Sequence, residues 1–188
     1  MNKKQWILGI TILSTLVLIA LNFNQAQSQS DLAKRGKYLV DAIGACGQCH
    51  TPRKGADPDM SMYLAGHPAG TPPPKYDFSM MQQGIFMATS PTFTAFAGPF
   101  GTSFAANLTP DKETGLGEWT EKMFIDSMRT GYHQGNQSNR KIFPPMPIKN
   151  AYAGISDEDL KAMWAYLKTI KPIKNEVSSP LNPRGRPY

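Results

Sequence analysis

The chain has 188 residues, with 16 Pro, 16 Gly and 10 Met, and a formal net charge of +6 at pH 7. This length suits one domain with an N-terminal extension, and the Pro and Gly content favours long irregular connections over a regular sheet or a dense helix bundle. The basic residues form no stripe interleaved with aromatic residues, which argues against nucleic-acid binding, and the two cysteines lie three positions apart, which argues against a disulfide framework.

The N-terminus has the layout of a secretory signal. Two lysines precede an apolar run over residues 6–23, and a polar stretch follows it. The run lies at the lower limit of the roughly 17–25 residues that cross a bilayer core. Two interpretations therefore stay open: a cleaved signal peptide within residues 1–30, or an uncleaved anchor formed by residues 6–23, which would give contact with the membrane. Both place residues 31–188 in the periplasm or on the exported face of the cytoplasmic membrane.

Residues 31–43 are predicted to form the first helix of the exported part. Apolar residues recur there with helical spacing, and Ser30 or Asp31 is a suitable N-cap. Gly36 lies inside this helix, where glycine costs about 1 kcal/mol relative to alanine. Such a glycine indicates a point at which a second helix approaches closely.

Residues 51–118 hold more than half of the prolines and show no clean helical period. Weak alternation before Gly98-Pro-Phe-Gly101 predicts a small β-hairpin over roughly residues 92–106. A long irregular segment inside a compact domain is typical of a functional site. A large flat cofactor would give this segment an apolar surface to pack on.

Two further helices are predicted downstream. One covers residues 119–131, with Thr120 as its N-cap and Gly131 as its stop signal. We expect its packed face to consist of Met123, Phe124, Ser127 and Met128.

The last predicted helix opens at Ser156 in the manner of a capping box, with Asp159 in the place of the usual glutamate, and ends before Pro172. The residues after it, 173–188, contain three prolines and are expected to run extended over the surface or to be loose. The predicted buried stripe of this helix is Leu160, Met163, Trp164, Leu167 and Ile170.

The segment Cys46-Gly-Gln-Cys49-His50 is the attachment signature of a c-type haem. The two thiols add to the two vinyl groups of the porphyrin, and a gap of two residues places both sulfurs along one edge. The adjacent His50 then lies beneath the iron as its proximal ligand. The sequence therefore predicts haem c, with Cys46 and Cys49 as attachment points and His50 as an iron ligand.

Competing interpretations of the two cysteines fit less well. A thioredoxin-like redox pair would follow a strand, whereas a helix precedes Cys46. A structural zinc site would need four ligands, and His67 and His133 are the only histidines left to complete one. Structural cysteines beside an incidental histidine are the third alternative.

Met146 is the best candidate for the second axial ligand of the iron. Prolines at positions 144, 145 and 147 surround it and fix the backbone on both sides. A rigid loop of this kind can hold a thioether against a metal with little further loss of entropy. Another methionine, a histidine or an open position stays possible at this stage. His/Met ligation raises the reduction potential and fills the position where oxygen or peroxide would bind.

Together these motifs resemble the class I cytochrome c superfamily, and more closely the mono-haem cytochrome c domains associated with bacterial periplasmic dehydrogenases. The resemblance implies an all-α, cytochrome c-like fold whose N- and C-terminal helices cross near the haem, here with a long irregular insertion. In that fold Gly36 would face Trp164 or Tyr166, and His50 and Met146 would be the proximal and distal iron ligands. The segments that carry the resemblance are residues 46–50, 107–119, 128–131, 144–147 and 160–167.

The expected domain organisation follows from this resemblance. Residues 1–30 are the signal peptide or anchor, residues 31–172 the cytochrome c domain with one haem, and residues 173–188 an extended tail. Related dehydrogenase subunits often carry two or three haem motifs, whereas this chain has one, so a multi-haem electron path is not implied. The role of the insertion over residues 51–106 stays open.

We expect an electron-transfer protein without catalytic residues, which acts as a carrier or as the electron-accepting subunit of a periplasmic redox enzyme. Its redox partners would be a dehydrogenase as donor, an oxidase as acceptor, or both. The alternative is a haem enzyme or gas-binding sensor with an open or labile sixth iron position. The Met146 loop argues against that alternative.

Overall fold

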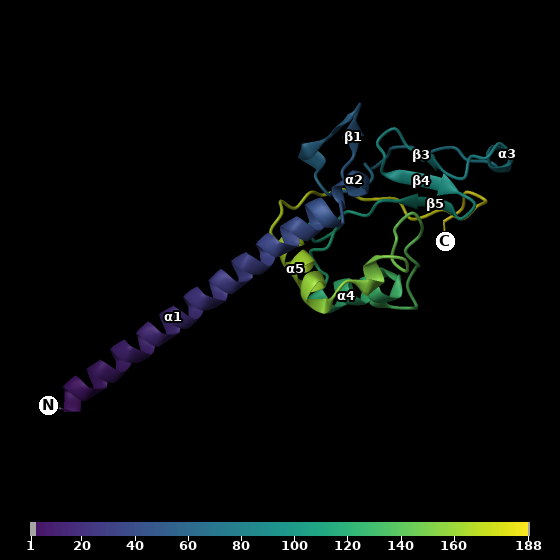
Figure 1. The fold of residues 1–188 in the computed structure, drawn as a ribbon. Coiled ribbons are helices and arrows are strands. Elements are labelled where there is room, and N and C mark those ends of the chain that lie inside the picture. Colours follow the sequence, from purple (N-terminus) through teal and green to yellow (C-terminus); the bar gives the residue numbers. More distant parts are fainter. Residues whose placement is uncertain (1–2, 188) are drawn as a thin grey trace.

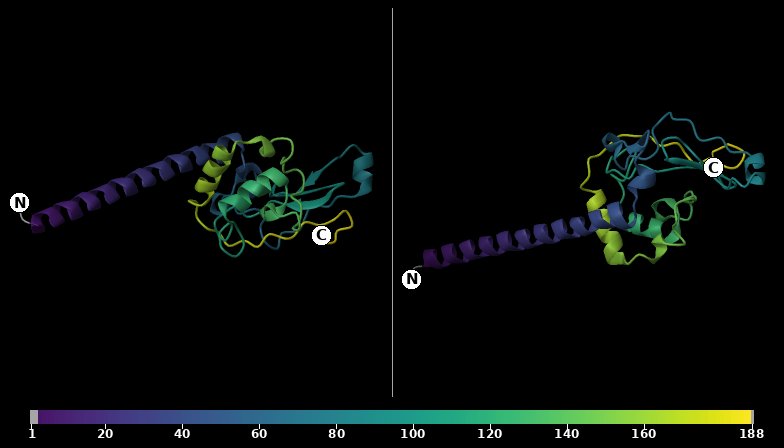
Figure 2. Two further views of the ribbon diagram at one scale, coloured as in Figure 1. Left: turned by 90° about the horizontal axis from the view of Figure 1, so that it is seen from below. Right: turned by 45° about the horizontal axis from the view of Figure 1, so that its top comes forward.

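The structure is a computed structural model that describes residues 3–187, with the backbone alone for residues 3–17, 20, 23, 24 and 78. A single long helix, α1 (Lys3–Tyr38), projects from the body of the molecule and enters it at its C-terminal end (Figures 1 and 2). A π-helical turn, η1 (Leu39–Ile43), continues it. The helix predicted over residues 31–43 is thus present, but its predicted start at Ser30 or Asp31 is wrong. No glycine or proline occurs between residues 10 and 35, so nothing interrupts the helix there.

The predicted signal peptide within residues 1–30, or anchor over residues 6–23, falls mainly on residues whose side chains lie outside the described part. It therefore stays a prediction. Among the residues that the structure describes, we find no helix with the length and apolar character of a membrane span.

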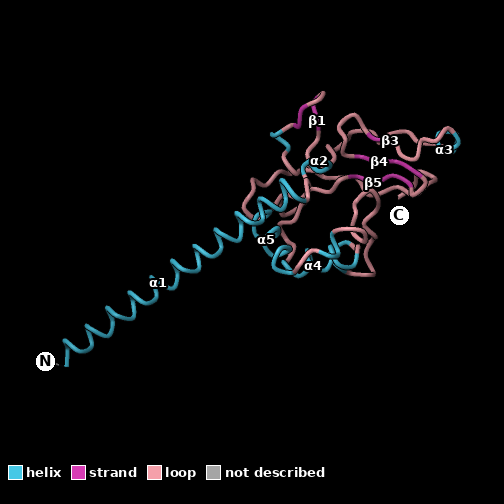
Figure 3. Tube along the Cα trace, in the orientation of Figure 1, coloured by secondary structure: helices cyan, strands magenta, loops and turns pink. Residues whose placement is uncertain are grey.

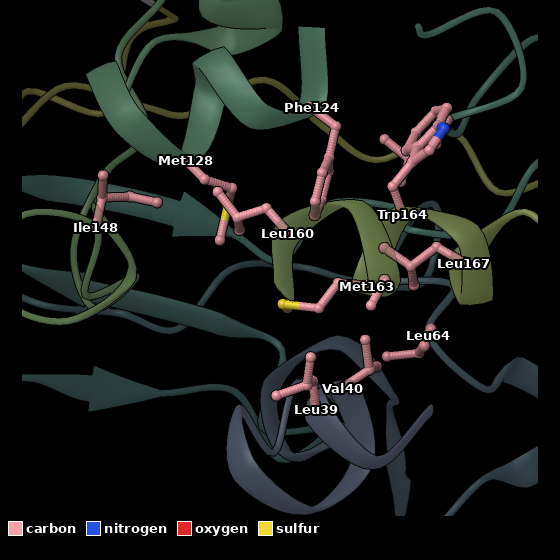
Figure 4. Packing of buried hydrophobic residues seen from close by; sticks show 12 residues of the cluster. Leu39, Val40, Leu64, Phe124, Met128, Ile148, Leu160, Met163, Trp164 and Leu167 are labelled. Carbon is pink, nitrogen blue, oxygen red and sulfur yellow. The ribbon is translucent and has the colours of Figure 1, made fainter. Parts of the chain in front are cut away.

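The core forms where α5 packs against the end of α1 and α4 packs against α5. The helix α5 (Asp157–Leu167) lies between η1 on one side and α4 (Glu121–Thr130) on the other (Figure 4). Figure 4 shows that each helix contributes apolar side chains to the contact. The main core residues are Leu39, Val40, Leu64, Phe124, Met128, Ile148, Leu160, Met163, Trp164 and Leu167.

The crossing of the N- and C-terminal helices that the resemblance implies is present. A Cβ built on Gly36 would lie 1.8 Å from the Ala162 carbonyl oxygen and 2.8 Å from Cβ of Tyr166. Of the two partners expected for Gly36, Tyr166 is therefore in contact, whereas Ala162 takes the place of Trp164. Gly36 lets the two backbones approach closely because it carries no side chain.

The signals at both ends of α4 and at the start of α5 act as predicted. The predicted end of α5 at Pro172 is wrong, because the helix ends at Leu167 and Ile170 lies beyond it, only partly buried. The Thr120 hydroxyl accepts a hydrogen bond from the Met123 amide at 3.2 Å, and Gly131 ends α4 in the left-handed conformation at φ 74°. The Ser156 hydroxyl caps α5 by accepting from the Asp159 amide at 3.2 Å. The Asp159 carboxylate pairs with Arg35 of α1 at 2.9 Å, so it tethers two helices where a capping box was predicted.

Two small antiparallel sheets occupy the segment between the first helices and α4, so the expectation of an all-α fold needs correction. One pairs β1 (Arg53–Lys54) with β2 (Asp57–Pro58), and the other has the order β3 (Ala88–Thr89), β4 (Ala95–Gly98), β5 (Gly101–Phe104). The hairpin predicted over residues 92–106 is confirmed as β4 and β5. Their register pairs Gly98 with Gly101 around a two-residue turn.

Irregular chain fills most of the remaining structure (Figure 3). Its short helical pieces are α2 (Gly47–His50), η2 (Met60–Met62), α3 (Phe78–Gln82), η3 (His133–Gly135) and η4 (Tyr152–Gly154). The small helix α3 lies at the tip of the lobe that carries β3–β5 (Figure 1).

The chain after α5, expected to run extended over the surface or to be loose, is tied to the body by specific hydrogen bonds. Asn175 is 5 % exposed, and its side chain bonds the carbonyls of Ala65 and His67 and the amide of Ala69. Further on, the backbone of Leu181 pairs with Thr102 of β5 through hydrogen bonds of 2.8 and 2.9 Å. These contacts join the tail to the segment that follows α2.

Candidate functional site

The segment Cys46–His50 forms one helical turn, two residues after the end of η1. The amide of His50 donates to the Cys46 carbonyl at 2.9 Å, which closes the turn. Residues three and four positions apart share one face of a helix, so this turn places Cys46, Cys49 and His50 on the same side. Ala45, at φ 45°, makes the sharp change of direction between η1 and α2.

His50 is buried and held in one tautomer. Its ring nitrogen Nδ1 donates a hydrogen bond to the Ala106 carbonyl at 2.8 Å, and 7 % of the residue is exposed. Because a carbonyl oxygen can only accept, Nδ1 carries the proton and the lone pair lies on Nε2. Burial lowers the pKa of His50, which favours the neutral ring, while the bond to Ala106 acts in the opposite direction. A neutral imidazole fixed through Nδ1 is the usual state of a histidine that binds a metal through Nε2.

The two thiols are free and partly buried. Burial raises the pKa of the Cys46 thiol to about 11 and also raises the pKa of Cys49. Reactive cysteine pairs of the thioredoxin type depend instead on a lowered thiol pKa. The environment of Cys46 and Cys49 therefore argues against a thiol–disulfide catalyst and suits thiols that are consumed in thioether bonds.

The two other histidines do not join this cluster. Both ring nitrogens of His67 are hydrogen-bonded, Nδ1 to the Thr94 hydroxyl at 2.9 Å and Nε2 to the Thr71 carbonyl at 3.1 Å. His133 packs edge-on against Trp119, with ring centroids 4.9 Å apart. Within residues 3–187 no group of three or more His, Cys, Asp or Glu side chains could hold a metal ion. A zinc site built on Cys46 and Cys49 is therefore not supported.

Met146 lies in a tight loop that packs against the core. It is partly buried and belongs to the shell around the main hydrophobic cluster. The loop is closed locally, since the Met146 amide donates to the Phe143 carbonyl at 3.2 Å and the Met146 carbonyl accepts from Ile148 at 3.0 Å. The Ser103 hydroxyl of β5 also donates to the Pro144 carbonyl at 2.6 Å.

The other described methionines occupy buried, half-buried and exposed positions. Met128 and Met163 are buried in the contact between α4, α5 and η1, as expected for methionines on helix faces. Met60 and Met81, in the irregular segment, are 63 % and 46 % exposed. Burial does not single out Met146, because four other methionines are half-buried as well: Met62, Met80, Met87 and Met123. Met146 is distinguished by the prolines on both sides of it, and its role as a ligand stays a prediction.

The residues present fit a c-type haem. Two neutral thiols lie on one helical turn with a histidine whose free lone pair is on Nε2, and this donor set matches covalent attachment together with proximal ligation. The sequence pointed to these side chains, but it gave no signal for Ala106 and Ser103. The first acts through a backbone carbonyl, and the second is one serine among many in the sequence.

Comparisons with known proteins find cytochrome c subunits of dehydrogenases. No family model matches the chain. It is 35 % identical over 163 residues to the gluconate 2-dehydrogenase cytochrome c subunit of Pantoea cypripedii, a match that covers 86 % of this chain and 28 % of that protein. It is 26 % identical over 176 residues to the alcohol dehydrogenase (quinone) cytochrome c subunit of Gluconobacter oxydans, covering 92 % of this chain and 29 % of that subunit.

A third relative has a name that specifies the number of haems. The chain is 28 % identical over 150 residues to a diheme cytochrome c-type protein of Cereibacter sphaeroides, which covers 78 % of this chain and 39 % of that protein. The chain thus spans less than two fifths of the length of each of these three curated relatives.

Proposed function

We propose that this chain, which is a cytochrome c domain related to the cytochrome c subunits of dehydrogenases, transfers electrons through one covalently attached haem. The observation that carries the proposal is the His50–Ala106 hydrogen bond. It leaves Nε2 as the metal-binding atom beside two neutral thiols on the same helical turn.

Each residue of the site has a defined task in this proposal. Cys46 and Cys49 hold the cofactor through two thioether bonds, and His50 ligates the iron through Nε2. The Met146 thioether would be the second iron ligand and would keep oxygen and peroxide from binding the iron. A haem bound in this way supplies one-electron ferrous–ferric chemistry without a bond to a substrate.

A single haem is proposed because the attachment motif occurs once in this sequence. Reduced protein treated with alkaline pyridine should give the spectrum of a c-type haemochrome, with one haem per chain. A chain without covalent haem would contradict the proposal. Loss of covalent haem in Cys46→Ser would locate the attachment.

The names of the relatives suggest the electron donor. The gluconate and alcohol dehydrogenase cytochrome c subunits point to a dehydrogenase that passes electrons to this chain, while a terminal oxidase is the proposed acceptor. We place this exchange in the periplasm or on the exported face of the cytoplasmic membrane, because the N-terminal 30 residues have the layout of an export signal or anchor. Co-purification of a dehydrogenase with the native protein would test the partner.

Binding of carbon monoxide separates electron transfer from the alternative of a haem enzyme or gas sensor. If Met146 fills the sixth position, the reduced native protein should bind carbon monoxide slowly or incompletely. Rapid and complete binding would indicate an open or labile position and would favour the alternative.

A further inference from the structure

The strand segment at residues 101–106 contacts both halves of the candidate site. The hydroxyl of Ser103 in β5 donates to the carbonyl of Pro144 at 2.6 Å, and Pro144 lies two residues before Met146. Three residues after Ser103, the Ala106 carbonyl accepts the hydrogen bond from Nδ1 of His50 at 2.8 Å. One short stretch of backbone therefore supports the loop of the proposed distal ligand and also orients the proximal one.

This segment is held on both edges. On one edge β5 pairs with β4, and on the other the Thr102 backbone pairs with Leu181 of the C-terminal tail. Beyond the strand, the amide of Ala105 donates to the Thr94 carbonyl at 2.8 Å, and its carbonyl accepts from the His67 amide at 2.9 Å. Since its neighbours fix it on each side, the segment can serve as a firm support for other groups.

Ser103 connects this fixed segment to the loop that carries Met146. It is 8 % exposed, so its hydrogen bond is largely shielded from competing water. The acceptor, Pro144, belongs to a run in which prolines at positions 144, 145 and 147 restrict the backbone on both sides of Met146. In so stiff a loop, a restraint on one carbonyl limits the displacement of a side chain two residues away.

We propose that Ser103 is a positioning residue for Met146, and that the insertion over residues 51–106 serves to hold the methionine loop closed through this serine. The inference rests on the proposed function, because it presumes that Met146 ligates the iron. The inference also assigns a function to the insertion, which the sequence alone did not indicate. Without the Ser103 hydroxyl, conformers in which Met146 has left the iron become more populated.

The test is the affinity of the ferric holoprotein for imidazole, which must displace Met146 before it can bind. The apparent affinity of such a ligand scales with the population of the open conformer. Ser103→Ala should therefore bind imidazole roughly two- to tenfold more tightly than the native protein, the factor expected from the loss of one hydrogen bond. Thr102→Ala is the matched control, because its backbone bonds to Leu181 do not need the side chain, and it should bind imidazole with native affinity.

Two outcomes overturn the inference while the proposed function stands. They are an unchanged imidazole affinity in Ser103→Ala, or an equal increase in Thr102→Ala, each with a native protein that shows the methionine–iron charge-transfer band. Absence of that band from the native protein would overturn both the inference and the proposed ligation.

A second pair of variants keeps the test available if Ser103→Ala does not fold. Ser103→Thr and Ser103→Val have nearly the same volume and differ in the hydroxyl. The threonine variant should keep an imidazole affinity close to native, whereas the valine variant should bind more tightly. Equal affinities in the pair would contradict the role of the hydroxyl.

Discussion

Gly36 of α1 lies against the backbone of Ala162 in α5, so closely that a Cβ on Gly36 would meet the Ala162 carbonyl oxygen at 1.8 Å. This contact sets the crossing of the N- and C-terminal helices, and that crossing forms the core beside η1 and the attachment turn.

Gly36→Ala should destabilise the protein. The added methyl group must push α1 and α5 apart, and overpacking of this kind typically costs about 1–3 kcal/mol. The gain in helix propensity, about 1 kcal/mol, offsets part of that cost. Denaturant unfolding should show a lower midpoint for Gly36→Ala. Gly154→Ala is the control, since a Cβ there has open space around it and should leave the midpoint nearly unchanged.

Stability should fall as the pH drops below about 6.5, the ordinary pKa of histidine. Burial lowers the pKa of His67 in the folded protein, so below that pH the unfolded chain binds a proton that the folded chain resists. The loss of stability between pH 7 and pH 5 should therefore be smaller in His67→Gln than in the native protein, as measured by urea unfolding at both pH values. An equal loss in both proteins would mean that other groups cause the dependence.

Asn175→Ala should release the C-terminal tail. The Asn175 side chain makes three hydrogen bonds to the backbone of residues 65–69, and at roughly 1 kcal/mol each their loss should destabilise the protein by about 2–3 kcal/mol. Limited proteolysis should then cut the tail faster. Glu176→Ala, at the exposed neighbouring position, should behave as the native protein does. Resistance of Asn175→Ala to proteolysis would show that the Leu181–Thr102 pairing holds the tail by itself.

Local signals in the sequence were sufficient for several features. The two ends of α4, at Thr120 and Gly131, and the start of α5, at Ser156, were predictable. Capping depends on residues close to the helix end, so the local sequence shows it. The hairpin of β4 and β5 was also predictable, since its turn lies between glycines at positions 98 and 101. The Cys46–His50 motif was recognisable for the same reason, because its residues are contiguous in the sequence.

Features that depend on distant backbone contacts were not predictable. The His50 ring bonds the backbone carbonyl of Ala106. Every residue type has such a carbonyl, so the sequence cannot indicate which residue is the partner. The pairing of Leu181 with Thr102 joins positions far apart in the sequence by backbone atoms alone. The true start of α1 was missed because the prediction relied on a capping residue, while the absence of glycine and proline upstream had the greater effect.

Electron transfer without a substrate bond depends most on the identity of the second iron ligand, and the ferric absorption spectrum of the holoprotein tests that identity most directly. The native protein should show the methionine–iron charge-transfer band of a low-spin His/Met cytochrome. Met146→Ala should lose it, whereas Met60→Ala, at an exposed position, should keep it. A band that persists unchanged in Met146→Ala would contradict the assignment of Met146 as the ligand.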